Sequence, residues 1–359
     1  MSNFQLLEEF LLFNSNTWWS IENQIFYLFC QYPELTFSQI LVHLKQKKVS
    51  VSEETVYQVL QFLFIPRGYL IRKDYWEKEP VYELVDKYRR DSSFTKHYYS
   101  FQETSPNHHM FIALADTHIG DEEIENIKLL DALYNYGIQL GIKNFFHIGD
   151  LFTKKGVNDV YQLLKKFHYE YPHPYPNELM TYGVLGNHDK KINEVLKEGY
   201  PYLDLRLLSA LCPSFYMFPR EKWIAEVSNI TINFSHKLFV NVFVPDLILS
   251  DIYEIQEFEK LFGCTHDVLI SGHLHQGIVY TGYDKYKKQE CLYLGVPSTS
   301  NINLNHTVAY LVNLQLGNDK NVKEIHTIPL KCDENYKITP EAEIPFYFHQ
   351  KNKVYRKVL

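Results

Sequence analysis

The sequence predicts an α/β protein in which a small, mostly helical N-terminal domain precedes a larger domain, and three observations support this. The chain has 359 residues, which is more than one ordinary core needs and enough for two domains. Residues 1–90 show helical spacing of apolar side chains followed by two short β-like runs. From Met110 to about residue 330, short apolar runs alternate with helical stretches, which is typical of an α/β domain. The polar stretch 91–109 shows no period and is predicted to be the linker.

The composition favours a folded protein with reduced thiols. Hydrophobic residues make up 45% of the chain, which is enough for a sizeable core. The formal charge of −7 argues against a chain that coats nucleic acid indiscriminately, but it allows a local basic site. The five Cys show no CxxC spacing, and the first residues lack the basic region of a signal peptide. We therefore expect a cytoplasmic protein without membrane association.

The N-terminal domain is predicted to be winged-helix-like. Helical stretches are expected at residues 20–34, 36–48 and 50–64. The second and third begin with a capping box, Thr36 with Gln39 and Ser50 with Glu53. Two short strands around a charged turn follow and resemble a wing. Because the third helix begins with acidic residues, we expect weak DNA binding without sequence preference, and docking to the catalytic domain, a second copy in a homodimer or a protein partner.

Five apolar runs of the larger domain each end at side chains that can bind a metal. In chain order, the runs end at Asp116 and His118, at Asp150, at Asn187 and His188, at His236, and at His273 and His275. Ligands of open α/β folds gather beyond the carboxyl ends of strands, so these five ends can meet. The i, i+2 spacing within the first and last pairs places both members on one side of an extended chain. Glycines directly before Asp150, Asn187 and His273 allow sharp exits. A lone His after a strand is more often structural, but five such ends in one domain predict one shared site.

The ordered pattern "DTH…GD…GNHD…SH…GHLH" resembles the calcineurin-like metallophosphoesterase superfamily over about residues 110–330. "LADTHIG", "GDLF" and "GNHD" are most similar to the nuclease subunit of double-strand-break repair complexes. The resemblance implies a two-layer β-sandwich flanked by helices, with a dinuclear site at one end. Two departures are a Ser before His236, where many members have Gly, and the little chain that follows His275. Residues 331–359 are assigned to a C-terminal tail.

The resemblance also implies the roles of the site residues. One metal would be held by Asp116, His118 and His275, the second by Asn187, His236 and His273, with Asp150 bridging them. Mixed carboxylate, amide and imidazole ligands suit divalent transition metals, with Mn²⁺ expected and Fe or Zn²⁺ as alternatives. Two such ions would clamp both oxygens of an in-line displacement at phosphorus, with a bridging hydroxide as the attacking group. His188 is then the predicted general acid, and Asp189 the residue that would orient it.

Lysines follow four of the ligand-bearing segments. The predicted substrate contacts are Lys154, Lys155, Lys190, Lys285, Lys287 and Lys288, with Tyr283 available to stack on a base. A basic rim suits a polyanion, although lysines are also common in solvated loops.

These observations leave three hypotheses. The favoured one is a dinuclear-metal-dependent phosphodiesterase that acts as a nuclease on DNA or RNA. The alternative is a phosphodiesterase or phosphatase for a small phosphoester such as a cyclic nucleotide. The third is a binding or scaffold protein with a degenerate site, against which the intact ligand set argues.

Overall fold

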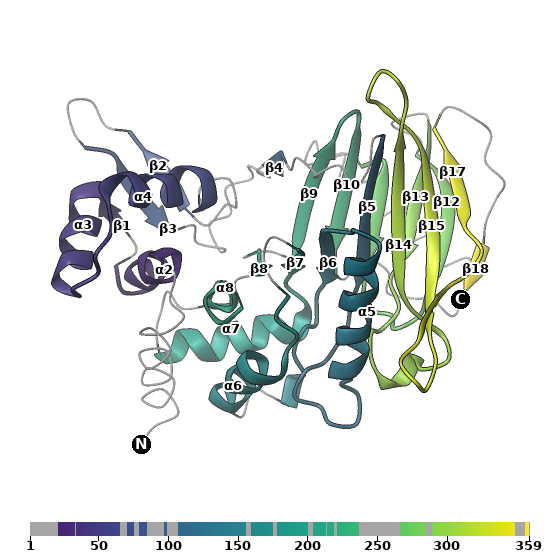
Figure 1. Cartoon of the computed structure of the whole chain (residues 1–359), viewed down its shortest axis with the longest axis horizontal. Coiled ribbons are helices and arrows are strands. Elements are labelled where there is room, and N and C mark those ends of the chain that lie inside the picture. The colour runs from purple at the N-terminus through teal and green to yellow at the C-terminus, as the bar shows by residue number, and fades with distance from the viewer. Residues whose placement is uncertain are drawn as a thin grey trace.

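The computed structural model describes most of the chain from Ile21 onward. The described residues are 21–32, 34–64, 70–74, 79–84, 97–98, 107–155, 159–174, 178–199, 204–212, 214–218, 221–236, 266–284, 289–348 and 356–358. They form a mixed α/β protein with two large sheets, a layer of helices and a small N-terminal sheet (Figure 1). The predicted α/β class is confirmed. No described helix is long and apolar enough to cross a membrane.

The first large sheet has the strand order β16-β15-β14-β5-β6-β7-β8, and β17 pairs with β15. Its strands are β5 (His108–Leu114), β6 (Asn144–Ile148), β7 (Met180–Val184), β8 (Phe215–Met217), β14 (Thr307–Leu316), β15 (Val322–Cys332), β16 (Ile338–Pro340) and β17 (Ile344–Tyr347). Strands β5 to β8 run parallel to one another, whereas β14 pairs antiparallel with β5. The carboxyl ends of β5, β6 and β7 therefore lie at one edge of this sheet.

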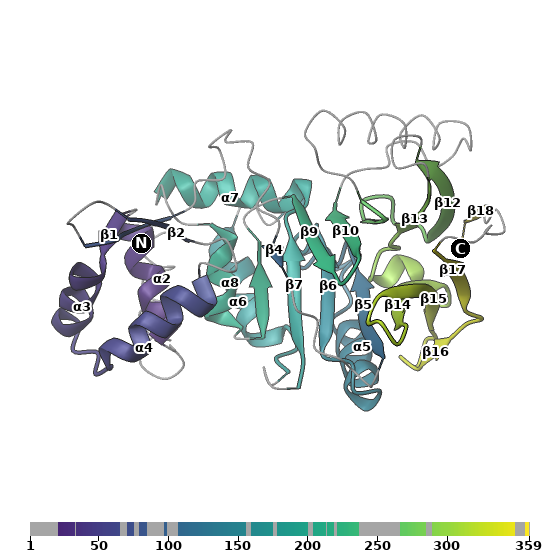
Figure 2. The same ribbon diagram turned by 90° about the horizontal axis from the view of Figure 1, so that it is seen from above.

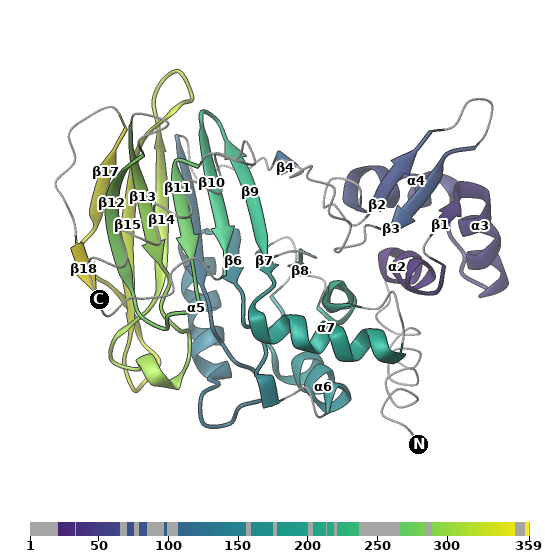
Figure 3. The same ribbon diagram turned by 180° about the vertical axis from the view of Figure 1, so that it is seen from behind.

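The second large sheet has the order β18-β12-β13-β11-β10-β9-β4 (Figure 3). Its strands are β4 (His97–Tyr98), β9 (Lys222–Val227), β10 (Ile230–Ser235), β11 (Val268–Ser271), β12 (Ile278–Asp284), β13 (Gln289–Gly295) and β18 (Arg356–Val358). Strand β11 runs parallel to both β10 and β13. Strand β4 lies within the stretch predicted as a linker, and β16 to β18 lie within the stretch assigned to a tail.

The two sheets share a core of apolar side chains. Phe111 of β5 belongs to this core, whereas its neighbour Ile112 belongs to the cluster under the helices, as strand alternation requires. Phe146 of β6 stacks on Phe234 of β10 with ring centroids 4.4 Å apart. Full burial of each such ring contributes about 1.5–3 kcal/mol. Phe146 and Phe234 precede the predicted ligands Asp150 and His236 by a few residues, so their contact joins the two sheets close to the predicted site.

Helices α5 (Ile127–Gln139) and α6 (Val160–Glu170) lie on the outer face of the first sheet (Figure 2). The other described helices are α7 (Asn187–Gly199), which runs on the opposite side from α5, η3 (Leu205–Leu207), α8 (Leu208–Leu211) and the short turn η4 (Asn301–Asn303). Leu129 and Leu133 of α5 are buried in one cluster with Phe145 of β6. Helix α7 begins at Asn187, so the first turn of this helix forms part of the ligand-bearing edge.

The described part of the N-terminal region combines four helical segments with a three-stranded sheet of order β1-β3-β2. Its elements are α2 (Ile21–Gln31), β1 (Glu34–Thr36), α3 (Phe37–Gln46), α4 (Glu53–Gln58), the π-helical segment η1 (Val59–Phe64), β2 (Leu70–Lys73) and β3 (Val81–Leu84). Helix α2 lies against η3 and α8, and its buried residues join the apolar cluster of the helix layer. The winged-helix assignment itself stays a prediction.

One of the two predicted capping boxes is correct. Thr36 accepts from the backbone of Gln39, whose side chain accepts from the backbone of Thr36. The second box is wrong, because α4 begins two residues later than expected. Ser52 is its N-cap and accepts from the backbone of Thr55 at 3.1 Å. Two serines compete for this position, and Ser52 is the one with extended backbone next to the helix.

Candidate metal centre

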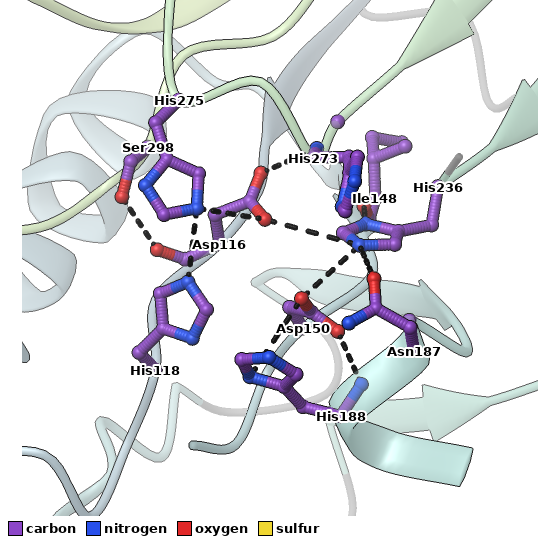
Figure 4. A network of polar contacts seen from close by, with 12 residues as sticks. Asp116, His118, Ile148, Asp150, Asn187, His188, His236, His273, His275 and Ser298 are labelled. Atoms are coloured by element: carbon purple, nitrogen blue, oxygen red, sulfur yellow. Dashed lines mark hydrogen bonds and ion pairs between the residues drawn. The ribbon is translucent and has the colours of Figure 1, made fainter. Parts of the chain in front are cut away.

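Each of the five apolar runs forms a strand, as predicted, and the five strand ends converge on one place (Figure 4). The potential ligand atoms form three overlapping groups, and within each group all the atoms lie within 4.8 Å of one another. The groups are Asp116, His118 and His275; His118, Asp150 and His188; and Asp150, His236 and His273. Asn187 joins them through its Oδ1, which lies 3.2 Å from His236 Nε2. The structure therefore brings together all seven residues predicted as ligands, with Asp150 in two of the groups.

The half of the centre around Asp116 is rich in imidazole, with Asp116 and His118 buried and His275 partly exposed. His118 Nε2 lies 3.1 Å from His275 Nε2, and this nitrogen of His275 lies 3.6 Å from Asp116 Oδ1. Asp116 Oδ2 accepts from the backbone of His273 at 2.8 Å, while Oδ1 is buried without a hydrogen-bond partner among the described residues. Burial raises the pKa of Asp116 to about 7, which shows how poorly the protein alone stabilises this carboxylate.

The half around His236 has a defined imidazole orientation. His236 Nδ1 donates to the carbonyl of Ile148 at 2.7 Å, because that oxygen can only accept. Its Nε2 then faces Asp150 Oδ2 at 3.2 Å. Burial alone would lower the pKa of His236, but the carboxylates of Asp116 and Asp150 raise it to about 9. Such backbone support of the second ring nitrogen is typical of a metal-binding histidine.

Five of the predicted ligands have left-handed backbone. The φ angles are 53° at Asp116, 49° at His118, 50° at Asp150, 77° at His273 and 58° at His275. The expectation that the i, i+2 pairs lie on an extended chain is therefore wrong, although both pairs do converge. Left-handed backbone costs about 1–2 kcal/mol for each non-glycine residue, so neighbouring groups must hold these loops. A ladder of backbone bonds does so, including Asp116 N to Gly149 O at 3.0 Å and His118 N to Asp150 O at 3.2 Å.

The three glycines before the ligands mainly allow neighbouring groups to approach the backbone closely, and only one of them forms a sharp turn. Only Gly149 has a left-handed φ, of +79°. A Cβ on Gly149 would lie 2.5 Å from the ring of His236, and one on Gly186 would collide with the backbone and carboxylate of Asp150. A Cβ on Gly272 would lie 2.5 Å from the carbonyl of Ile148. The expected sharp exit therefore applies to Gly149, while the other two glycines leave room for neighbouring ligands.

His188 lies at the edge of the centre. Its backbone N–H donates to Asp150 Oδ1 at 2.8 Å, and its Nδ1 lies 3.8 Å from Asp150 Oδ2. This Nδ1 is without a hydrogen-bond partner among the described residues. Its side chain is 25% exposed, more than those of Asp150 and His236, so it can meet a molecule that arrives from solvent. Burial lowers the pKa of His188, the charge of Asp150 opposes this shift, and the charges of His236, Lys191 and Lys154 add to it.

Asp189 has a different position from the one expected. Its carboxylate is fully buried and accepts from three backbone N–H groups, those of Gly186, Leu151 and Phe152, at 2.8, 3.3 and 3.1 Å. These contacts connect the loop after β6 with the loop after β7. Since the ring of His188 makes no hydrogen bond to it, Asp189 supports the loops that carry Asp150 and Asn187 and does not orient His188.

The predicted basic rim is only partly available to a substrate. Lys155 pairs with Asp121 at 3.0 Å, and Lys190 pairs with Glu221. Lys154 and Lys191 are exposed and lie near enough to His188 to lower its pKa. Lys285, Lys287, Lys288 and the side chain of Tyr283 lie outside the described part of the chain.

Two supporting groups were not anticipated from the sequence. Thr117, between two ligands, donates to Leu151 O at 3.0 Å and accepts from the buried His147 at 3.1 Å. The segment 298–303 contacts Asp116 and His275 through Ser298 and Asn303. The one available signal for this segment was a polar run, "PSTSN", directly after an apolar strand, which is the pattern of the ligand-bearing loops themselves.

Comparison with known proteins gives distant structural likenesses. No protein family matches the sequence, and no curated protein matches it. A Vps29 variant from Entamoeba histolytica is 14% identical, with 66% of this chain and 99% of that chain covered at a TM-score of 0.37. GAP50, the anchor in the inner membrane complex of Plasmodium, is 12% identical, with 68% and 90% covered at 0.43. A dimetal phosphatase from Danio rerio is 9% identical, with 67% and 98% covered at 0.37. At these identities and TM-scores the likenesses do not decide what the chain does.

Proposed function

We propose that this chain is a metal-dependent phosphoesterase of the calcineurin-like type. The observation that carries the proposal is the convergence of seven oxygen and nitrogen donors from five strand ends, with Asp150 shared between two of the ligand groups. One ion would be held by Asp116, His118 and His275, and the other by Asn187, His236 and His273, with Asp150 between them. A scaffold protein would not need to hold five residues in left-handed backbone around one carboxylate.

The donors fit a pair of divalent transition-metal ions. Asp116 Oδ1 is buried without a hydrogen-bond partner among the described residues, which a bound cation would remedy. His236 Nδ1 already donates to the carbonyl of Ile148, so His236 Nε2 is directed at the other donors. The set contains no thiolate and mixes imidazole with carboxylate and amide oxygen, which suits Mn²⁺, Fe or Zn²⁺. When bound, such ions withdraw charge from phosphoryl oxygens and stabilise the charge that develops at phosphorus.

His188 is placed to transfer a proton to the leaving oxygen. Its ring lies beside that of His118, with centroids 5.1 Å apart, and is open to solvent on one side. Lys154 and Lys191 lower its proton affinity in the free protein. An anionic phosphoester bound beside His188 would offset those charges and raise its proton affinity again. The imidazole could then protonate the leaving oxygen as the ester bond breaks.

The proposed substrate is a phosphodiester of DNA or RNA. This substrate is supported by two exposed lysines, Lys154 and Lys191, whose charges act on His188, since two cations near a proton donor suit a chain of phosphates. The N-terminal region would then contribute through docking to a second copy or a protein partner, as the sequence predicts. A cytoplasmic location also stays a prediction.

One assay separates the candidate functions. Metal-stripped full-length protein, reloaded with Mn²⁺, would be offered single- and double-stranded DNA, RNA, bis-p-nitrophenyl phosphate and p-nitrophenyl phosphate, with Asp150→Asn as the inactive control. We expect cleavage of the nucleic acids and the diester, with slower hydrolysis of the monoester. Activity on the monoester alone would favour a small-molecule phosphatase. Two bound ions without any hydrolysis would favour a binding protein.

A further inference from the structure

Asp116 and His275 share a supporting segment that is remote from both in the sequence. Both residues have left-handed backbone, with φ of 53° and 58°. Ser298 Oγ donates to the carbonyl of Asp116 at 2.7 Å, as Figure 4 shows. Asn303 donates through one nitrogen to the carbonyl of His275 at 2.9 Å and to that of Ser298 at 2.9 Å. A continuous path of hydrogen bonds therefore runs from one metal-ligating loop to the other.

The segment is itself anchored to the rest of the fold. Ser298, Thr299 and Ser300 are fully buried. The backbone of Thr299 donates to Ala115 O at 2.8 Å, and its hydroxyl donates to Val308 O at 2.8 Å. The backbone of Asn301 donates to Ile124 O at 2.9 Å, just before helix α5. Such a support can hold a strained loop in one position, which a segment fixed only at its ends could not.

We propose that Asn303, together with Ser298, is a positioning residue for the half of the metal centre formed by Asp116, His118 and His275. This inference rests on the proposed function, because it assigns a role toward the metals of that site. Asn303 holds the backbone of His275. His275 Nε2 thereby stays 3.6 Å from Asp116 Oδ1 and 3.1 Å from His118 Nε2. Without the amide donor, the strained backbone of His275 is free to relax and the imidazole loses its alignment.

The chain offers a matched control on the same short turn. The side chain of Asn301 accepts from Asn126 at 2.6 Å and donates to the carbonyl of Glu125 at 3.0 Å, so it is directed at the start of α5. Asn303→Ala and Asn301→Ala remove the same side chain two positions apart. Only the first removes a contact to a metal-ligating residue.

The test is titration of the metal-free, full-length protein with Mn²⁺, followed by calorimetry and by electron paramagnetic resonance. The wild type should bind two ions and show the signal of a spin-coupled pair. Asn303→Ala should keep one ion at wild-type affinity and bind the other about 10–100-fold more weakly, as loss of a supporting contact typically does. At a concentration of Mn²⁺ that fills both sites of the wild type, the resonance spectrum of Asn303→Ala should be that of a single bound ion and not that of a spin-coupled pair. Asn301→Ala should match the wild type in both measurements.

The outcomes are distinguishable. Wild-type protein that binds fewer than two ions would contradict the proposed function itself. Two ions bound equally tightly by the wild type and by Asn303→Ala would overturn only the positioning role, as would equal weakening in Asn301→Ala. If thermal denaturation of Asn303→Ala shows no cooperative unfolding transition, Ser298→Ala provides the second variant. Ser298→Ala removes the hydrogen bond to Asp116 O and is expected to lower the affinity for the same ion. Unchanged affinity for both ions would overturn the proposal.

Discussion

His236 Nε2 lies 3.2 Å from Asn187 Oδ1, although the two residues end strands of different sheets. Asn187 follows β7 of the first sheet, and His236 follows β10 of the second. The aromatic contact between Phe146 and Phe234 joins the two sheets, and Phe234 lies two residues before His236. The candidate metal centre therefore lies where the two sheets pack together, and each proposed half takes donors from both sheets.

Substitution of Asp150 should affect both ions, whereas substitution of His236 should affect one. Asp150 belongs to two ligand groups, one with His118 and His188 and one with His236 and His273, while His236 belongs to one group. We expect Asp150→Asn to lose at least about 100-fold in affinity for both ions, more than the loss of a supporting contact would cause. His236→Ala should retain one ion. Metal content after dialysis, measured by mass spectrometry, checks both expectations, and equal stoichiometry in the two variants would contradict them.

Gly186 should tolerate no side chain. A Cβ there would overlap the backbone and carboxylate of Asp150, whereas a Cβ on Gly141 meets nothing within 4 Å. Gly141 has a φ of +71°, so Gly141→Ala should cost only about 1 kcal/mol of backbone strain. Gly186→Ala should destabilise by about 1–3 kcal/mol through overpacking and should also weaken metal binding. Urea denaturation with and without Mn²⁺ compares the two variants. Normal metal affinity in Gly186→Ala would show that Asp150 can move aside.

The ligand residues could be predicted from the sequence because each lies in a short local pattern. An apolar run followed by Asp, Asn or His is visible within ten residues, and parallel strands place such ends at a common edge. The left-handed backbone of Asp116 and His118 has no such signal. It follows from backbone bonds to Gly149 and Asp150, which lie about thirty residues away.

The supporting contacts were missed for the same reason. Asp189 looks like a partner of its neighbour His188, yet its acceptors are satisfied by backbone groups of Leu151 and Phe152. Asn303 looks like a loop residue until the fold places it against the carbonyl of His275. Sequence spacing predicts which residues share a strand end, but it does not predict which backbone groups those ends expose to one another.

His147 should contribute a loss of stability to the metal-free protein in mild acid, whereas Asp116, whose pKa is raised, contributes with the opposite sign. Burial lowers the pKa of this histidine to about 3, from the usual value near 6.5. Because its folded-state pKa is depressed, the stabilisation is fully present above about pH 6.5 and is lost progressively as the pH falls toward 3, where only the unfolded chain takes up the proton. Between pH 7 and pH 5 this group should account for a loss of about 2 kcal/mol.

The check is the free energy of unfolding in urea at both pH values, for the wild type and for His147→Gln. Gln retains a donor for Thr117 but does not titrate, so the wild type should lose about 2 kcal/mol more than the variant. An equal loss in both proteins would show that other groups carry the acid sensitivity.

Removal of His188 should spare the metals and slow turnover according to the leaving group. A general acid typically contributes about 10²–10⁴-fold, and a nitrophenolate leaves without protonation. His188→Ala should therefore lose this factor in kcat on a nucleic acid but little on bis-p-nitrophenyl phosphate. Metal affinity is the decisive second measurement, because His188 also shares a ligand group with His118 and Asp150. Weakened metal binding in the variant would identify His188 as a ligand instead.

Lys154 and Lys191 should contribute more to the binding of a polyanion than Lys155 and Lys190. Lys154 and Lys191 are exposed beside His188, whereas Lys155 and Lys190 are held by Asp121 and Glu221. If the substrate is a polyanion, each phosphate contact releases counterions and contributes about 0.7–0.9 to the slope of log affinity against log salt. The double variant Lys154→Ser with Lys191→Ser should lower that slope by about 1.5. It should also slow cleavage of DNA or RNA, with the small diester little changed.

The matched control is the double variant Lys155→Ser with Lys190→Ser, which removes the same formal charge from positions adjacent to Lys154 and Lys191. Because these two ammonium groups already have carboxylate partners, their removal should change the slope by less than half as much. KM for a single-stranded oligonucleotide and for bis-p-nitrophenyl phosphate, measured between about 50 and 200 mM salt, gives the comparison. Equal losses on both substrates would point to a small phosphoester as the natural substrate. Equal effects of the two double variants would show that net charge, and not the lysines beside His188, governs substrate binding.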